Sequence, residues 1–468
     1  MLVNGILERE MKEKRETEVF ETMPVPKALA KMAIPTILGQ IIILVYNLAD
    51  TFFVGQTNDP YMVAGVSLIL PIFNVLIALA NLSSVGGGTY VSRLLGTGKL
   101  EEASAVTSFS VWLGVIISAV FAMLTAVFME PLLHFLGAGE HTYVYAKQYV
   151  TCVIVFGAVP TVLANVLSNM LRSTGRSAEA GFGVALGGLL NIALDPLFMF
   201  VILPKGSEIL GVGIATFLSN VISCIYYAAV LLRIRDSTVI TLRPVRISGD
   251  NVKRVFNVGL PACLVTLLFD VDYMIIDKLM AGYSDIALAA VGIVLKAERL
   301  PLNVGIGISQ GMVPLVAYNY ASKNYDRMKK IFRLASCAGI VCGLVSIAAY
   351  KALAGNIINF FINDADTISI GAAFLRARSP ATLFMFMSFF TVHLFQALGK
   401  GGTALYLGVQ RWVMLNIPML FILNHFFGMY GIVWTQLIAD FINVVISFII
   451  LARFMRTGLT AEERSTDG

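Results

Sequence analysis

Twelve long apolar stretches divide this chain, and no other feature restricts its fold as strongly. Each holds roughly 20 residues, enough to cross the hydrocarbon core of a bilayer as a helix. Strand-like alternation is weak within them, so they indicate helices and not the strands of a barrel. The spans are predicted at residues 30–54, 62–86, 104–129, 145–171, 181–203, 210–232, 256–281, 286–318, 332–354, 370–398, 403–424 and 429–452.

Composition supports the same fold class. Of the 468 residues, 57% are hydrophobic and only 13% are charged, and the mean hydropathy is +0.80. A soluble protein of this size cannot bury so much apolar surface. The sequence therefore predicts an all-α polytopic membrane protein that contacts the lipid bilayer along most of its length.

Positive charge falls mainly on one side of the spans. The two tails and the loops on the same side hold most of the 34 Lys and Arg residues, Lys400 and Arg411 being assigned to one of those loops. Because cytoplasmic loops retain positive charge, both termini are predicted to be cytoplasmic. The N-terminal "EREMKEKRETE" lacks the apolar core of a signal peptide. The net charge of +5 reflects this asymmetry, so no nucleic-acid partner is expected.

The second half of the chain repeats the first. "MAIPTILGQ" at 32 corresponds to "NVGLPACLV" at 257, which aligns Pro35 with Pro261, and "LRSTGR" at 171 corresponds to "FQALGK" at 395. Six spans per half make the repeat parallel, about an axis along the membrane normal, and a cavity between two such lobes is typical of transporters. The predicted parts are a tail at 1–29, a six-helix bundle at 30–232, a basic linker at 233–255, a second bundle at 256–452 and a tail at 453–468.

Polar residues gather at one depth in the first half. By helical rise, Asp195 lies about 13 Å and Asp50 about 8 Å below the outer ends of their spans, with Thr216 at a similar depth. Asn191 precedes Asp195 by one turn on the same face. An ionised Asp in the hydrocarbon costs at least about 2.5 kcal/mol unless it meets water, a cation or a proton. These four residues therefore predict a coupling-ion site, either for Na⁺ on hard oxygen ligands or for a proton shared by crowded carboxylates.

Structural roles are the alternatives for these residues. Asp195 precedes Pro196 and could cap a helix segment, and Asp50 could be an interfacial acid. Thr216 could bond to a carbonyl of its own helix. Asn165 and Asn169, nearer the cytoplasm, are further candidates for ion binding, although hydrogen bonding between helices explains them equally well.

The motifs "IPTILGQIIILVYNLADTFFVGQ", "LRSTGR", "LNIALDP" and "VAYNYASKN", in this order within a doubled six-helix chain, resemble the multidrug and toxic compound extrusion (MATE) family. The resemblance covers roughly residues 20–455. It implies a V-shaped pair of bundles in a bacterial inner membrane, acting as a monomer that is not an enzyme. It also implies export of amphipathic, often cationic compounds in exchange for Na⁺ or H⁺, with no other cofactor. Carried over, the coupling residues are Asp50, Asn191 and Asp195, with Thr216 beside them.

The second half departs from part of that family. Members resembling the marine vibrio type use acids in the seventh and tenth helices, whereas the tenth span here, "SPATLFMFMSFFTVHLFQALG", has none, and the counterpart of Asp195 is Ile417. The first half is therefore expected to carry the coupling. The second half has its own charged cluster, for which an ion pair between Lys296 and Asp270 or Asp272 competes with a role in the cavity wall. This cluster comprises Asp270, Asp272, Asp277, Lys296, Glu298 and Arg299.

A substrate cavity lined by amide, Met and aromatic side chains would suit varied flat cations, although such residues are also ordinary membrane core. The expected lining residues are Gln40, Tyr46, Phe269, Met387 and Gln396. Three other functions fit less well. A flippase for a lipid-linked precursor would need a strongly cationic cavity, an intramembrane aspartyl protease would need the absent GxGD motif, and a channel would not explain the duplication.

Overall fold

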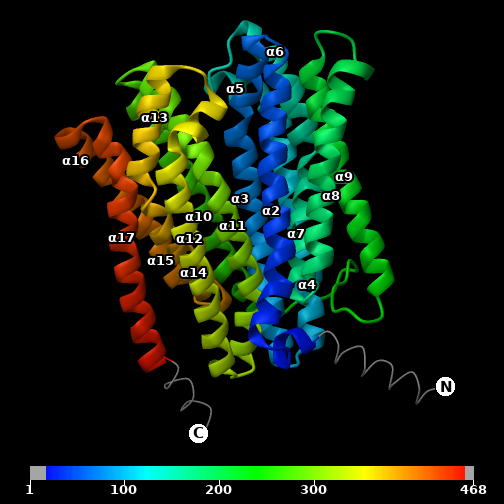
Figure 1. Ribbon diagram of the computed structural model, residues 1–468. Coiled ribbons are helices and arrows are strands. Elements are labelled where there is room, and N and C mark those ends of the chain that lie inside the picture. The colour runs from blue at the N-terminus through cyan, green and yellow to red at the C-terminus, as the bar shows by residue number, and fades with distance from the viewer. Residues whose placement is uncertain (1–16, 459–468) are drawn as a thin grey trace.

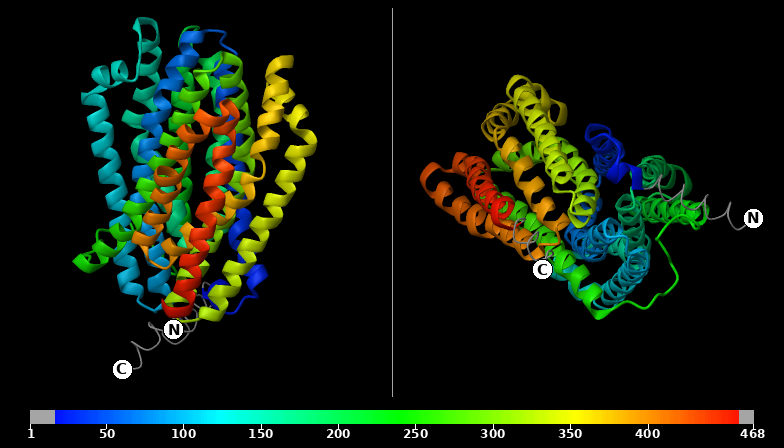
Figure 2. Two further views of the ribbon diagram at one scale, coloured as in Figure 1. Left: turned by 90° about the vertical axis from the view of Figure 1, so that its left-hand side faces the viewer. Right: turned by 90° about the horizontal axis from the view of Figure 1, so that it is seen from below.

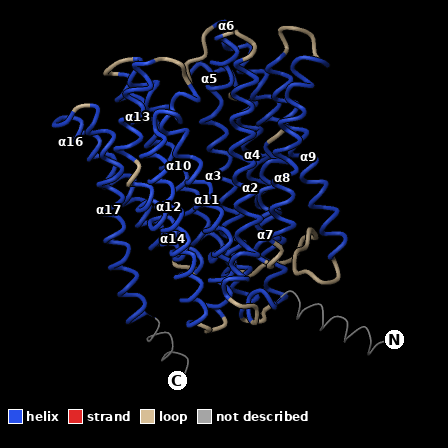
Figure 3. Tube along the Cα trace, viewed as in Figure 1, coloured by secondary structure: helices blue, strands red, loops and turns tan. Residues whose placement is uncertain are grey.

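The computed structural model describes residues 17–458, and every regular element in that range is a helix (Figure 3). Ten helices are long and apolar enough to cross a membrane, and two bent pairs bring the total to twelve, as predicted. The first half contains α2 (Val25–Gly55), α3 (Pro60–Gly96), α4 (Leu100–Val127), α5 (Met129–Phe135), α6 (Glu140–Val150), η1 (Thr151–Phe156), α7 (Ala158–Ser173), α8 (Ser177–Pro196), η2 (Leu197–Ile202) and α9 (Glu208–Ile234). The second half contains α10 (Gly249–Ala281), α11 (Asp285–Ala321), α12 (Tyr325–Phe361), α13 (Ala365–Arg378), α14 (Ala381–Ala397), α15 (Gly401–Val409), η3 (Gln410–Asn416), α16 (Ile417–Phe427), α17 (Met429–Arg453) and η4 (Phe454–Gly458).

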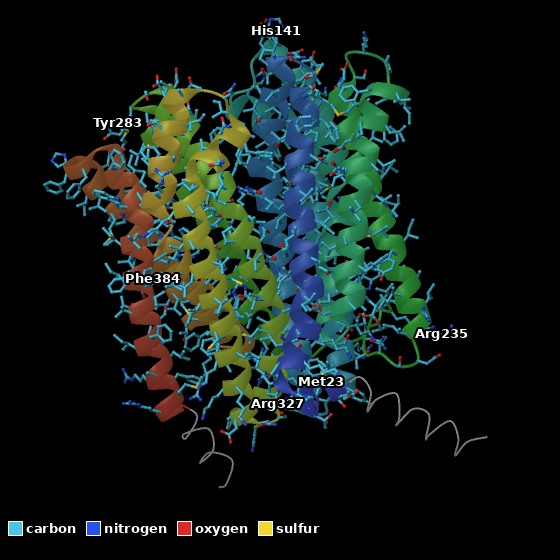
Figure 4. All side chains as sticks on the ribbon, in the orientation of Figure 1. Met23, His141, Arg235, Tyr283, Arg327 and Phe384 are labelled. Atoms are coloured by element: carbon cyan, nitrogen blue, oxygen red, sulfur yellow. The ribbon has the colours of Figure 1, made fainter. Side chains whose placement is uncertain are left out.

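The helices form two bundles that stand side by side, which we call the N-lobe (α2 to α9) and the C-lobe (α10 to η4) (Figures 1 and 2). We call the end that holds Met23, Arg235 and Arg327 the lower end, and the end that holds His141 and Tyr283 the upper end (Figure 4). Because each lobe contributes an even number of crossings, the described chain enters and leaves at the lower end.

The linker between the lobes spans residues 235–248, which is shorter than the predicted 233–255. Helix α10 begins earlier than its apolar stretch because Ser248 caps it, its hydroxyl oxygen accepting a hydrogen bond from the Asn251 backbone N–H at 3.3 Å. The linker backbone in turn accepts hydrogen bonds from side chains of α4, which hold it along the N-lobe.

Glycines bring the lobes into backbone contact in their lower halves. Gly259 of α10 lies so close to α3 that a β-carbon there would be 2.0 Å from the Leu82 carbonyl oxygen. At a second contact between the lobes, a β-carbon at Gly311 of α11 would lie 2.6 Å from the Ala33 α-carbon of α2. Only a residue without a side chain permits these approaches. The lower contact between the lobes is therefore closed tightly by backbone packing.

Side-chain contacts continue the joint between the lobes to mid-depth. Two hydrogen bonds cross it there, from Asn81 to Thr266 at 3.0 Å and from Gln40 to Gln310 at 3.3 Å. Above them, Met274 of α10 has 60% of its surface accessible. The described contacts thus join the lobes from the lower end to mid-depth.

Replacing Gly259 by Ala is expected to disfavour the arrangement in which the two lobes are closed at the lower end. The new methyl group would overlap the Leu82 carbonyl, and such overpacking typically costs about 1–3 kcal/mol. Distances between spin labels on the exposed residues Thr97 and Ser322, at the lower ends of the two lobes, should gain a longer population. Gly402→Ala is the matched control, because its β-carbon would meet open space. Identical distance distributions for both variants would contradict the role of Gly259.

The segment before the first spanning helix is fastened to the opposite lobe. The Arg327 guanidinium of α12 donates hydrogen bonds to the backbone carbonyls of Phe20 at 2.7 Å and Met23 at 2.6 Å. The Phe20 ring stacks on Tyr318 with centroids 4.7 Å apart. Residues 17–23 therefore tie the leading helix of the N-lobe to the lower end of the C-lobe.

Candidate ion-coupling site

Asp50 of α2 and Asp195 of α8 come together inside the N-lobe, because Asp50 borders the same cavity as Thr216, and Asn191 links Thr216 to Asp195. Small residues allow this meeting, because glycines on α8 face α2 directly. A β-carbon at Gly188, for example, would lie 2.6 Å from the Ile42 side chain. Asp195 is fully buried, and the helix changes to the wider η2 immediately after Pro196. The sequence prediction that these two acids share a site agrees with this geometry.

Asn191 and Thr216 complete the cluster. The Asn191 amide nitrogen donates to the Asp195 carboxylate at 3.4 Å and to the Thr216 hydroxyl at 3.3 Å. Asn191 stands one turn before Asp195 on the same helix face, whereas Thr216 comes from α9. The structure therefore brings together all four residues expected to form the core of the site.

Three acceptor oxygens of this cluster are buried without a hydrogen-bond donor: Asp50 Oδ1, Asn191 Oδ1 and Asp195 Oδ2. An unsatisfied buried polar group costs about 1–3 kcal/mol, and more when it is charged. A proton would join the two carboxyl groups, while a small cation would satisfy the three oxygens together. The donor set of two carboxylates and neutral oxygens fits a monovalent ion, and the described residues contain no cluster of three or more His, Cys, Asp and Glu.

A cavity of about 110 Å³ lies beside Asp50 and has room for water molecules. Tyr46, predicted as a cavity residue, lines it together with Asn47 and Thr51. Tyr149 also lines it and was not predicted, because an aromatic residue near the start of a span is equally typical of the membrane interface. The cluster of acids and polar residues thus borders a cavity.

Asn165 and Asn169 belong to a different cluster. The Asn169 amide donates to Asn165 at 3.2 Å, and its carbonyl oxygen accepts from the Arg172 guanidinium at 3.0 Å. Among the described residues, both are engaged within α7 and form no hydrogen bond to the acids of the site. Their expected participation in ion binding is therefore not supported by this geometry, because the helix directs them to their own neighbours.

Comparison with known proteins decides the family. The MatE family model matches residues 35–197 and again residues 261–422, one match in each lobe. This chain belongs to the MATE family. It is 30% identical over 445 residues to the multidrug export protein MepA of Staphylococcus saprophyticus, covering 95% of this chain and 97% of that one. The corresponding protein of Staphylococcus haemolyticus is 28% identical over 447 residues, with the same coverage.

Solved structures agree on the fold. The outward-facing conformation of a multidrug resistance MATE family transporter superposes with a TM-score of 0.89 at 23% identity, covering 95% of this chain and 98% of that one. A MATE crystal structure in the straight conformation gives 0.87 at 23% identity, over 94% and 99%. The predicted twelve-helix fold and the family resemblance are confirmed. The protein is a multi-pass transporter, so the protease hypothesis is wrong.

The other residues predicted to line the substrate cavity of this MATE transporter lie in different places. Gln40 lies at the contact between the lobes, and Phe269 packs edge-on against Trp412 with ring centroids 5.2 Å apart. Met387 and Gln396 are 6% and 5% exposed. Both are buried on α14, which packs against α11, α12, α15 and α17, and their place in a cavity wall stays a prediction.

The expected ion pair of Lys296 with Asp270 or Asp272 does not form among the described residues. Glu298 instead pairs with Arg378 of α13, the guanidinium Nε and carboxylate Oε2 being 2.8 Å apart in the interior. Two residues along a helix turn the side chain by about 200°, so Lys296 faces the opposite side from Glu298 and is exposed. Of the charged cluster, Lys296 and Glu298 thus lie on opposite faces of α11, while Asp270, Asp272 and Asp277 belong to α10.

A second buried pair joins Arg411 of η3 to Asp440 of α17, at 2.6 and 3.0 Å. Gln436 donates to the same carboxylate at 2.7 Å, and Asp272 lies buried with no hydrogen-bond partner on either oxygen. The assignment of Arg411 to a loop was wrong, because it is 3% exposed within a spanning segment. Sequence reasoning could not find these pairs, since each charge stands alone in an apolar stretch.

Proposed function

We propose that this transporter exports amphipathic, often cationic compounds across a bacterial inner membrane in exchange for H⁺ or Na⁺. The lobes rock to expose the cleft to either side, the monomer is the working unit, and the lower end is cytoplasmic. The naming of its relatives as multidrug export proteins supports the substrate class. The concentration of Lys and Arg in the loops and tails of the lower end supports the orientation.

The observation that supports ion coupling is the set of buried oxygens without a hydrogen-bond donor on Asp50, Asn191 and Asp195, beside a cavity of about 110 Å³. A structural carboxylate pair would have donors. An ion-binding site leaves its oxygens free until the ion arrives.

The driving force follows from the stoichiometry. One monovalent ion exchanged for one monovalent cation moves no net charge, so the chemical gradient of the ion alone drives export. A tenfold ion gradient then supports about a tenfold substrate gradient. Ion and substrate also act on each other reciprocally: whatever the ion does to the substrate affinity, the substrate does to the ion affinity. We expect the two to weaken each other's binding.

A fluorescence titration of ethidium binding to the purified transporter tests this proposal. One series varies Na⁺ at fixed pH, and the other varies pH without Na⁺. Ethidium should bind more weakly in high Na⁺ or at low pH, and the series that responds identifies the ion. Asp195→Asn should flatten the response, whereas Asp236→Asn in the linker, an exposed acid outside the site, should not. A flat response of the wild type in both series would contradict the coupling site.

A further inference from the structure

Residues 17–23, which we call the strap, precede helix α2 and lie against the lower end of the C-lobe (Figure 4). The carbonyl groups at the end of a short helical turn lack partners within the turn. Here two side chains of the opposite lobe supply the donors. The Arg327 guanidinium donates to the carbonyls of Phe20 and Met23 at 2.7 and 2.6 Å, and the Asn319 amide donates to Phe20 at 3.1 Å. The C-lobe thus binds the strap through its backbone.

The strap also contributes to the hydrophobic core of the C-lobe. Val19 and Phe20 are 2% and 1% exposed, and they belong to one buried cluster with side chains of α11 and α12. Glu21 accepts a hydrogen bond from the Tyr318 hydroxyl. Because the complete burial of apolar side chains is stabilising, packing and hydrogen bonds together hold the strap on the C-lobe.

The strap has almost no slack. Its last bound residue, Met23, is separated from Val25, the first residue of α2, by Pro24 alone. Two peptide steps reach at most about 7 Å. If the lower end of α2 moves away from α11 by more than this reach, the movement pulls the strap off the C-lobe.

The corresponding segment of the second half is held with more slack. The repeat that aligns Pro35 with Pro261 pairs the strap with the end of the linker, and it pairs α12 with α4, the third spanning helix of the N-lobe. Helix α4 holds the linker, because Ser108 accepts a hydrogen bond from the Val245 amide at 3.2 Å. Helix α10 begins four residues later, at Gly249, which allows about 14 Å of reach. The linker can therefore stay on α4 while α10 moves, whereas the strap cannot stay on α12 while α2 moves.

We propose that the strap is a latch on the lower end, which leaves α11 and α12 each time the lobes separate there and binds again when they close. Arg327 is the residue that sets how firmly this latch holds. The inference rests on the proposed rocking of the lobes, and it makes a segment outside the twelve spans part of the transport cycle. It does not depend on the substrate or on the ion that drives export.

Distances between spin labels test the latch in the reconstituted transporter. One pair of labels, on Thr97 and Ser322, reports the separation of the lobes at the lower end. A second pair, on Thr22 and Ser322, reports whether the strap is bound. Both pairs are introduced into a protein from which the five native cysteines have been removed. In the wild type we expect the short distance to dominate, and any long component to occur in the same fraction of molecules for both pairs.

Arg327→Gln should raise the ratio of long to short distances about tenfold for both pairs, because hydrogen bonds from a charged donor contribute at least about that factor. Lys330→Gln is the matched control, since it removes an exposed cation from the same helix, and it should change neither distribution. Arg327→Lys keeps the charge but not the planar fork, so its ratio should be intermediate. Phe20→Leu removes the ring that stacks on Tyr318 and should shift both pairs in the same direction, which tests the latch without changing Arg327.

Two results would overturn the latch while leaving the export function intact. One is a pair of wild-type distributions in both Arg327→Gln and Phe20→Leu. The other is a separation of Thr97 from Ser322 while Thr22 keeps its short distance, which would mean that α2 unwinds and the strap stays bound. Ethidium transport by the wild type in proteoliposomes is measured in parallel. A wild type that moves no ethidium would refute the proposed function, whereas the two label distances decide the latch.

Discussion

Replacing Asp195 by Asn is expected to abolish ion-driven export while leaving the transporter folded. The amide has the shape of the carboxyl group and can keep the contact with Asn191, but it cannot exchange a proton or neutralise a cation. With a tenfold ion gradient, accumulation of ethidium should fall from about tenfold in the wild type to none. The measurement is gradient-driven ethidium transport in proteoliposomes, with Asp236→Asn as the control for a lost surface acid.

Downhill movement of ethidium separates a coupling defect from a broken transporter. The Asp195→Asn protein should still equilibrate the dye across the membrane without an ion gradient, because the cleft and the lobe contacts are untouched. Its melting temperature in detergent should not fall, since the change removes one of the donorless buried oxygens. Wild-type accumulation by the variant would remove Asp195 from the mechanism.

The parts of this site that the sequence predicted correctly depend on local geometry. Depth in the membrane follows from helical rise, which placed Asp50, Asp195 and Thr216 at one level. The one-turn spacing of Asn191 and Asp195 placed both on one face. Neither inference needed the identity of the neighbouring helix. Asn165 and Asn169, which lie in a different cluster from the acids, share a helix with Arg172, whose guanidinium donates a hydrogen bond to Asn169.

The charged cluster of the C-lobe shows where such reasoning fails. Which acid meets which base depends on how each helix is rotated and which helix lies beside it, and neither is written in a spacing. Glu298 and Arg378 are far apart in the chain yet meet in the interior, while Lys296 is exposed. Arg411 falls inside the predicted span 403–424, yet it was counted with the loop charges because the sequence does not show that Asp440 pairs with it in the interior.

The hydropathy pattern also failed to predict where the helices end. Helix α3 runs to residue 96, well past its predicted apolar limit at 86, through the polar sequence "SSVGGGTYVSR". Apolar residues report where the bilayer is, whereas backbone hydrogen bonds continue a helix into any surroundings. Gly86, at that limit, and Gly96, in the extension, lie against the C-lobe, which no single-helix pattern predicts.

The second large effect is expected in stability. Asp440→Asn should lower the free energy of unfolding by about 3–5 kcal/mol, because it leaves the Arg411 guanidinium as an uncompensated charge in the C-lobe interior. Asp440 is fully buried and accepts two hydrogen bonds from Arg411, whose guanidinium also lies 4.2 Å from the Trp412 ring centroid. The Trp412 ring holds the Arg411 guanidinium in place, so this group cannot turn toward water.

A matched surface variant isolates burial as the cause. Asp250→Asn breaks an ion pair of similar length, 2.7 Å to Arg254, whose side chains are 68% and 55% exposed, and should cost no more than about 1 kcal/mol. Denaturation of both variants in detergent micelles gives the two free energies. Arg411→Met combined with Asp440→Leu should recover most of the loss, because an apolar pair leaves no buried charge. If the double variant is no more stable than Asp440→Asn, the pair is held by packing around it and not by the balance of its charges.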